Sequence, residues 1–529
     1  MKHIKYIIGA VLVALAANSC VWDLNVTPID PNSNTGDKAL IDEASFNSFL
    51  AGVYLGFATS GYYGANGDPS ISGLDGGASQ YIRGLYHHSE LTTDESVCGW
   101  NDQTIKNFHW MNWTTDDTFI YAFYSRIFMV VGMANEFIRE AKASDVEFAS
   151  KQQMIDEARV LRAISYYHAI DNFGNVPFAD ETAIVGAVPS QIKRADLYNW
   201  LVDELTDLVN NSALPEKAAT TYGHANKSVA KFLLAKVYLN AEVFAGEKAY
   251  DKCAAVLKDL MDDGYSLHTT PNGTLSAYQD LFAADNNLCT DEIIFPIEQD
   301  YTNTNSYGAT NYIIFASTGG QMDAFAQGIS SGWGGLRMTP EFYNKFDSKD
   351  ARALFYTATQ QADIDDIGEF SNGYAFMKFT NVLSTGDVPN KTWNEDDQVW
   401  VGPGFVNTDF PMMRYADVLL MAAECEARGA AVDGYAGFNA VRARAGLGSI
   451  AAPTLQNILD ERARELYQEC WRRNDLIRYG LFTTGDYLWQ WKGNVKDGKA
   501  VDSYRNLFPI PDSDRLANSL LEQNDGYDK

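Results

Sequence analysis

The sequence predicts a mainly α-helical fold, in which tetratricopeptide-like helical hairpins support a loop-rich half with a few short strands. Three observations predict it. Apolar residues recur with the period of an α-helix along several segments. These segments come in neighbouring pairs with small residues at their expected contacts. Between the helical blocks, residues 271–411 show no helical period and are rich in Gly, Asn, Asp and aromatic residues.

Helix-breaking residues bound most of the periodic segments. Gly174 and Pro177 end the second segment, Pro215 follows the third, and Gly480 ends the last. The predicted helices, in chain order, span residues 121–141, 151–173, 195–209, 228–244, 250–262, 414–428, 434–444 and 455–479.

Small side chains favour close packing between paired helices. Ala230 and Ala235 lie in the segment that precedes 250–262, and Ala416 and Ala423 lie in the segment that precedes 434–444. Three cysteines share these helical patterns and are expected to be small core residues: Cys253, Cys425 and Cys470.

The irregular region 271–411 contains few strand candidates, of which residues 292–297 are the clearest. A loop region this long is usually functional when a rigid scaffold holds it.

The N-terminus predicts export and a lipid anchor. Lys2 and Lys5 precede an apolar run at residues 6–17, which is too short to span a bilayer of about 30 Å. Small residues then lead into Cys20, as in a lipoprotein signal sequence. Acyl chains on Cys20 would form a stable anchor, because each buried methylene contributes about 0.8 kcal/mol. We therefore expect a signal peptide at 1–19 and a lipidated tether at 20–36.

Composition narrows the ligand class. The net charge is -28, which repels phosphate backbones, so we expect no nucleic-acid partner. A neutral ligand fits better, and aromatic residues make up 13% of the chain.

Without Cys20 the cysteines number five and show no zinc spacing, so neither a disulfide framework nor zinc is expected. We expect no cofactor, and a structural calcium held by scattered carboxylates stays open.

Five groups of segments stand out in chain order: 20–24 with 27–31; 157–163 with 172–177; 414–420 with Glu424; 439–447; and 461–466 with 472–476 and 507–511. In sequence and in order they resemble the SusD/RagB family of outer-membrane nutrient-binding lipoproteins. The resemblance extends along nearly the whole mature chain. Residues 90–95 and 482–493 further resemble the family's founding, starch-binding member.

The resemblance implies a helical fold with four tetratricopeptide-like units and no catalysis. It divides the mature chain into an N-terminal region at 37–270 and a C-terminal region at 271–529. It also implies location at the outer membrane, facing the exterior, and docking on a SusC-like TonB-dependent transporter. The implied ligand is starch or a maltooligosaccharide.

A neutral sugar needs aromatic rings to stack on and polar groups to meet its hydroxyls. By position, the resemblance assigns Trp100, Tyr307 and Trp333 as stacking rings. The hydroxyl binders it assigns are Asp75, Arg83 and Gln103. Cys98 departs from the family pattern, because the founding member has a second Trp there, so the aromatic surface is expected to be shorter.

Other readings stay open. Another neutral polysaccharide or a peptide could be the ligand of the same kind of protein. An all-α glycosidase would use two carboxylates, for which Asp94 and Glu95 near Trp100 are the candidates. Trp393 and Trp400 flank an acidic run and are equally consistent with a solvated loop, so we leave them outside the predicted site.

Overall fold

The structure is a computed structural model that describes residues 40–527. The predicted signal peptide, Cys20 and the tether lie outside the described residues. None of the helices in the described part is both long and apolar enough to cross a membrane.

The described chain is mainly helical, as predicted. Its helices are α3 (Glu43–Ala58), α4 (Tyr81–Ser89), α5 (Gln103–His109), α6 (Thr118–Ala143), α7 (Lys151–Phe173), α8 (Arg194–Asn211), α9 (Lys227–Leu239), α10 (Ala241–Ala245), α11 (Tyr250–Met261), α12 (Ala277–Asp280), α13 (Ala309–Ser317), α14 (Pro340–Tyr343), α15 (Tyr415–Ala427), α16 (Gly434–Arg444), α17 (Leu455–Leu466), α18 (Arg472–Arg478) and α19 (Asp512–Ala517).

The strands are short. They are β1 (Val97–Cys98), β2 (Val176–Pro177), β3 (Gln191–Ile192), β4 (Ile293–Ile297), β5 (Leu336–Met338), β6 (Phe355–Tyr356), β7 (Tyr374–Phe376), β8 (Thr392–Asn394), β9 (Val399–Val401) and β10 (Phe410–Arg414). One four-stranded sheet has the order β1-β5-β7-β6, and β4 with β10, β2 with β3 and β8 with β9 form separate pairs. The strand predicted at 292–297 is confirmed as β4.

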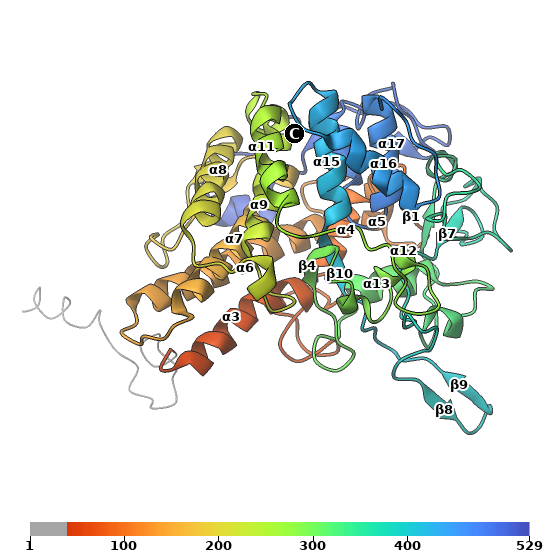
Figure 1. Ribbon diagram of the computed structural model, residues 1–529, viewed down its shortest axis with the longest axis horizontal. Helices are drawn as coiled ribbons and strands as arrows, with labels where there is room; N and C mark the ends of the chain where they lie inside the picture. Colours follow the sequence, from red (N-terminus) through yellow and green to blue (C-terminus); the bar gives the residue numbers. More distant parts are fainter. Residues whose placement is uncertain (1–39, 528–529) are drawn as a thin grey trace, which may run out of the picture.

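Paired helices make up one side of the molecule and loops the other (Figure 1). Helices α6, α7, α8, α9 and α11 contact one another in sequence order, and α15 packs on α16. The predicted segments 151–173 and 434–444 coincide with α7 and α16. Glycines in the left-handed region mark both C-terminal ends, since Gly174, at φ 70°, follows α7 and Gly446, at φ 78°, lies just after α16.

Two predicted helices are wrong in their continuity. The segment 228–244 breaks at Asn240, whose side-chain amide donates to the carbonyl of Lys236. The segment 455–479 breaks between α17 and α18, where Gln468 and Cys470 have φ of 61° and 68°. Cys470 is buried, as expected, but it lies in this break and not in a helix.

Partners distant in sequence produce the second break. The backbone N–H of Gln468 donates to a carboxylate oxygen of Glu95, and Lys378 donates to the carbonyl of Tyr467. Both backbone groups would otherwise serve the helix, so a buried polar network replaces one turn of α-helix.

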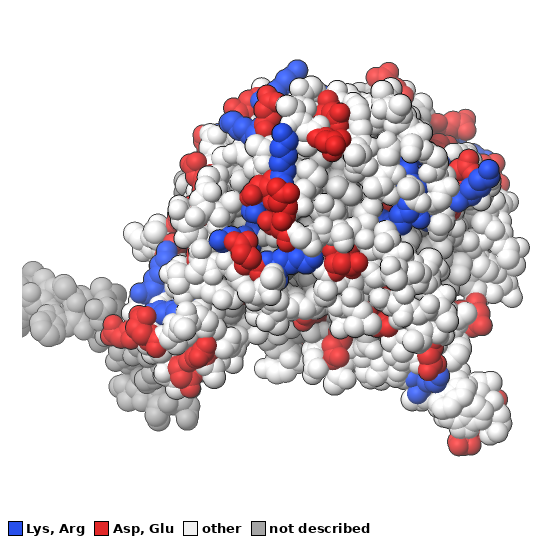
Figure 2. All heavy atoms as spheres, in the orientation of Figure 1, with Lys and Arg blue, Asp and Glu red and all other residues white. Residues whose placement is uncertain are grey.

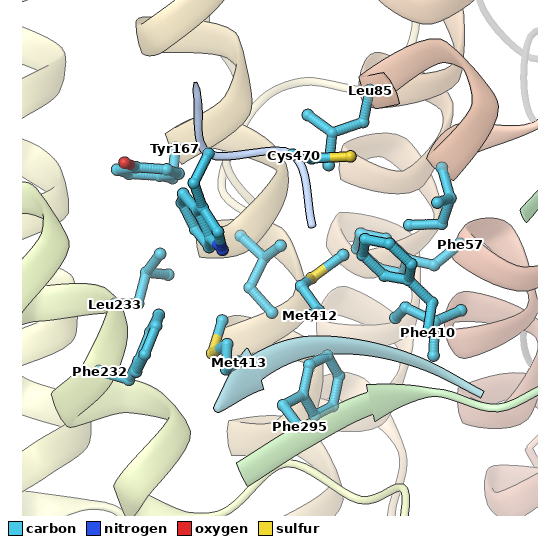
Figure 3. Packing of buried hydrophobic residues seen from close by; sticks show 14 of the residues in the cluster. Phe57, Leu85, Tyr167, Phe232, Leu233, Phe295, Phe410, Met412, Met413 and Cys470 are labelled. Atoms are coloured by element: carbon cyan, nitrogen blue, oxygen red, sulfur yellow. The ribbon is translucent and has the colours of Figure 1, made fainter. Parts of the chain in front are cut away.

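The main hydrophobic cluster of the described residues includes members from Leu40 to Leu521, and two small clusters lie apart from it. Figure 3 shows Phe57, Leu85 and Phe232 from the N-terminal helices meeting Phe295 of β4 and Phe410 of β10. The helical side and the loop-rich side therefore share one core, which holds the loops in fixed positions.

Candidate functional site

Four partly exposed aromatic rings form a continuous row on the loop-rich side, and we call Trp100, Trp333, Tyr307 and Phe405 the aromatic arc. The ring centroids of Trp100 and Trp333 are 6.3 Å apart, and those of Trp333 and Tyr307 are also 6.3 Å apart. Phe405 continues the row at 5.5 Å from Tyr307. The three rings predicted from the sequence thus lie together, although they come from three separate loops.

The small sheet brings the two tryptophans together. Trp100 follows β1, which pairs antiparallel with β5, so the residues after β1 lie opposite those before β5. The N–H of Gly99 donates to the carbonyl of Gly335 at 2.9 Å, and Nε1 of Trp100 donates to the carbonyl of Trp333 at 3.4 Å. The backbone N–H of Trp333 in turn donates to Phe315 of α13 at 2.7 Å.

Gly335 has a steric role in this arrangement. A β-carbon at Gly335 would lie 2.8 Å from Nε1 of Trp100 and 3.1 Å from Sγ of Cys98. The indole ring of Trp100 therefore rests directly on the glycine backbone, and any larger residue would displace it.

Arg83 lies on α4 with its guanidinium held by aromatic rings. The guanidinium carbon is 4.7 Å from the centroid of Tyr312 and 5.6 Å from that of Trp100. Nε of Arg83 is buried without a hydrogen-bond partner among the described residues. Arg83 therefore holds a charged donor group beside the arc by stacking.

Asp75 and Tyr307 converge with Arg83 at Gly77. A β-carbon at Gly77 would lie 2.4 Å from a guanidinium nitrogen of Arg83, 3.2 Å from Oδ1 of Asp75 and 3.3 Å from Cβ of Tyr307. Asp75 is exposed and accepts a hydrogen bond from the N–H of Ala78 at 2.8 Å. Its second carboxylate oxygen remains available for a ligand hydroxyl.

Gln103 stands apart from this convergence. It is exposed at the first position of α5, and its amide nitrogen donates to Oδ1 of Asn107 at 2.8 Å. Only its place three residues after Trp100 connects it with the arc.

Two residues of the site were not predicted. Phe405 extends the arc, and Asn66 accepts a hydrogen bond from the Tyr307 hydroxyl at 2.8 Å. The flanking Gly402, Pro403 and Gly404 are the one sequence signal that marked Phe405 as a loop residue. Cys98 is buried beneath Trp100, and burial raises the pKa of its thiol to about 11, so it adds neither a ring nor a nucleophile.

The carboxylate pair considered for glycosidase chemistry does not face this surface. Asp94 is fully buried and forms an ion pair with Arg472 at 2.7 Å. Glu95 is also buried, and burial together with nearby Glu90 raises its pKa well above the ordinary value. Both acids hold the core together, so neither reaches a ligand on the arc.

The rings of the arc are partly exposed, and two large cavities lie elsewhere. One of about 920 Å³ lies between Tyr265, Tyr415 and α16, and one of about 560 Å³ lies between α3 and His224. Within residues 40–527, no group of three or more His, Cys, Asp or Glu side chains is arranged to hold a metal ion.

This geometry suits a neutral, extended, hydroxyl-rich ligand. Aromatic faces accept the C–H faces of sugar rings, and Asp75, Arg83 and Asn66 offer acceptors and donors at the edge. An open row of rings suits a chain molecule better than a small enclosed one.

Two family models match separate parts of the chain. The SusD family matches residues 291–527, and a SusD-like family described as "Starch-binding associating with outer membrane" matches residues 77–239. The starch-binding protein SusD of Bacteroides thetaiotaomicron is 29% identical over 581 aligned positions that cover 99% of each chain. The C-terminal part of the chain thus matches the SusD family model, and the chain as a whole is similar to SusD.

Solved structures share the fold. Surface glycan-binding protein A from Bacteroides thetaiotaomicron has a TM-score of 0.70 at 19% identity, with 92% of this chain and 99% of that chain covered. Its complex with laminarihexaose has a TM-score of 0.69 at 19% identity, with 91% and 99% covered. The names of these relatives agree with the prediction of a binding protein and not an enzyme.

Proposed function

We propose that this protein binds starch or related α-glucan oligosaccharides on the aromatic arc and passes them, unchanged, to a TonB-dependent outer-membrane transporter. The single observation that carries the proposal is the contact of three predicted stacking rings, Trp100, Trp333 and Tyr307, on one open surface beside Arg83 and Asp75. Gln103 is proposed as an additional polar contact.

The size of the arc sets the expected affinity. A sugar chain that covers about 80–100 Å² on each of three rings gains about 6–7 kcal/mol at roughly 25 cal/mol per Å². Association and ordering then cost several kcal/mol, which leaves dissociation constants of roughly millimolar to tens of micromolar. Weak capture suits a protein that must release its ligand to a transporter.

Starch is preferred to other glycans because the starch-binding protein SusD matches along the whole chain, whereas the laminarihexaose complex is similar in fold at lower identity. The net charge of -28 also favours a neutral polymer over an acidic one. We also propose that lipid on Cys20 attaches the protein to the outer membrane, with the arc facing outward.

The proposal is tested by native gels that contain starch, pullulan, laminarin or casein, run beside a reducing-sugar release assay. We expect retardation by the α-glucans without product formation. Retardation by laminarin alone would mean that the ligand has a different glycosidic linkage from the one proposed. Retardation by casein alone would indicate a peptide ligand. Release of reducing sugar would overturn the binding role.

The transporter partner is tested by co-purification of the protein with the transporter from membranes. The lipid anchor is tested separately with Cys20→Ala. We expect this variant to leave the membrane fraction and to bind glycan as the parent does. Membrane retention of that variant would contradict the lipid anchor.

A further inference from the structure

A two-stranded hairpin, β8 with β9, projects from the loop-rich side of the molecule (Figure 1). Trp393 and Trp400 are directly paired across its two strands. Their ring centroids are 5.4 Å apart at an interplanar angle of 68°. Both rings are well exposed, at 41% for Trp393 and 50% for Trp400.

This exposure is not required by the stability of the hairpin. A cross-strand aromatic pair does stabilise two isolated strands, which are marginal in water on their own. Smaller β-branched residues would serve that purpose with less exposed apolar surface. Tryptophans at projecting positions are therefore candidates for a binding surface.

The charged groups of the hairpin lie at its turn and at its base. In Figure 2 the projecting lobe is largely white, with a few acidic and basic groups at its end and base. Lys391 lies with its ammonium 5.5 Å from the Trp400 centroid and is paired with Asp387. The turn between the two strands adds three exposed carboxylates, Glu395, Asp396 and Asp397. The amides of Asn394 and Gln398 flank them.

The hairpin is joined rigidly to the aromatic arc. A β-carbon at Gly402 would lie 2.6 Å from the backbone of Ile329, and the N–H of Ser330 donates to the carbonyl of Pro403 at 2.9 Å. The segment 329–330 leads directly to Trp333. At the base, Nδ2 of Asn407 donates to Oδ1 of Asn390 at 2.8 Å and closes the hairpin.

The distance between the two aromatic groups is limited by the chain. Phe405, the last ring of the arc, follows Trp400 by five residues, which span at most roughly 18 Å when fully extended. A polysaccharide that occupies the arc can continue over this distance, whereas a short oligosaccharide cannot.

We infer that Trp393 and Trp400 form a second stacking site for the same neutral glycan, reached only by chains long enough to extend beyond the arc. The inference rests on the proposed glycan-binding function. A protein partner is the alternative occupant, and continuity with Phe405 through a fixed junction favours the glycan. Linking two weak sites on one polymer raises the overall affinity without a new strong contact.

The test uses the purified full-length protein with both tryptophans changed together. Trp393→Val with Trp400→Val keeps a strand-forming pair but removes the large rings, whereas Trp393→Tyr with Trp400→Tyr retains aromatic faces. Binding of maltotriose and of amylopectin is measured for the parent, both hairpin variants and Trp100→Ala.

We expect the valine pair to weaken amylopectin binding by about three- to tenfold and to leave maltotriose binding unchanged, with the tyrosine pair close to the parent. Equal amylopectin binding by the parent and the valine pair would overturn the inference while the proposed function stands. If the valine pair lost affinity equally for maltotriose and amylopectin, the inference would also be overturned, because the hairpin would then act only through the arc. Loss of transporter co-purification with unchanged amylopectin binding would assign the rings to a protein partner.

If the parent binds neither ligand, the proposed function fails and the inference fails with it. If Trp100→Ala abolishes maltotriose binding while the valine pair behaves like the parent, only the hairpin inference fails.

Discussion

The backbone carbonyl of Trp333 accepts a hydrogen bond from the indole N–H of Trp100 at 3.4 Å, so the Trp333 backbone holds the Trp100 ring in position. The tilt of 50° between their planes gives the surface a curve. A curved row of rings matches a polymer that turns along its length. The two rings are also neighbours, with centroids 6.3 Å apart, so removal of either ring takes a packing partner from the other.

Trp100→Ala and Trp333→Ala should each weaken starch binding at least about fivefold, because each removes one stacking face. The fold-loss of affinity in the double variant should be smaller than the product of the two single fold-losses, since the rings are in contact and their contributions are coupled. Calorimetric titration with a maltooligosaccharide measures all three. Strictly multiplicative losses would show that the rings act independently.

Arg83→Lys should lower glycan affinity by about five- to tenfold, although the charge is kept. The planar guanidinium stacks on Tyr312 and presents donors in a fixed direction, which an ammonium group cannot do. Arg428→Lys is the matched control, because Arg428 also stacks, 4.9 Å from the Tyr250 ring, but on the helical scaffold. Equal affinities for Arg83→Lys and the control would remove Arg83 from the site.

Gly335→Ala should displace the Trp100 ring and lower glycan affinity as far as Trp100→Ala does. The added methyl group would lie 2.8 Å from the indole, which must move. Gly132→Ala is the control, since a β-carbon there meets nothing within 4 Å and replaces glycine within α6. That control should bind like the parent and gain about 0.5–1 kcal/mol of stability. Parent-like glycan affinity in Gly335→Ala would show that the ring has room to adjust.

The contribution of Glu90 to stability should fall as pH rises from about 5 to 8. Burial raises the pKa of Glu90 to about 8, so the folded state keeps a proton that the unfolded chain releases near the ordinary pKa of 4.5. Stability from this group is present below the unfolded pKa and is lost as pH rises through the folded pKa. The melting temperature of Glu90→Gln should therefore depend less on pH than that of the parent.

Glu395→Gln supplies the comparison for this pH series, because Glu395 is exposed at the hairpin turn. Its melting temperature should follow the pH dependence of the parent. Parallel curves for the parent and Glu90→Gln would mean that Glu90 is ionised in the folded protein at neutral pH.

The sequence predicted those features that depend on neighbouring residues. Helices α7 and α16 were predicted to the residue, because glycines mark their C-terminal ends. Helix α13, which follows Tyr307, was missed because its residues are all buried and leave little amphipathic contrast. Helix α4, which carries Arg83, is amphipathic but has only 9 residues, too few for its period to stand out in the sequence. The break at Gln468 depends on Glu95 and Lys378, which no local pattern reveals.

The candidate site divides in the same way. Trp100 and Trp333 are marked by glycine and polar neighbours, whereas Phe405 joins the arc only through the fold. The burial of Asp94 and Glu95 likewise appears only in three dimensions, where Arg472 and Gln468 use both side chains as partners.

A crystal structure of the protein with a bound maltooligosaccharide tests the central claim most directly. The account predicts sugar rings stacked on Trp100, Trp333 and Tyr307, with hydroxyl groups within hydrogen-bond distance of Asp75 and Arg83. Density for the sugar in the cavity beside His224 or in the groove beside Tyr415, with the aromatic arc bare, would contradict it.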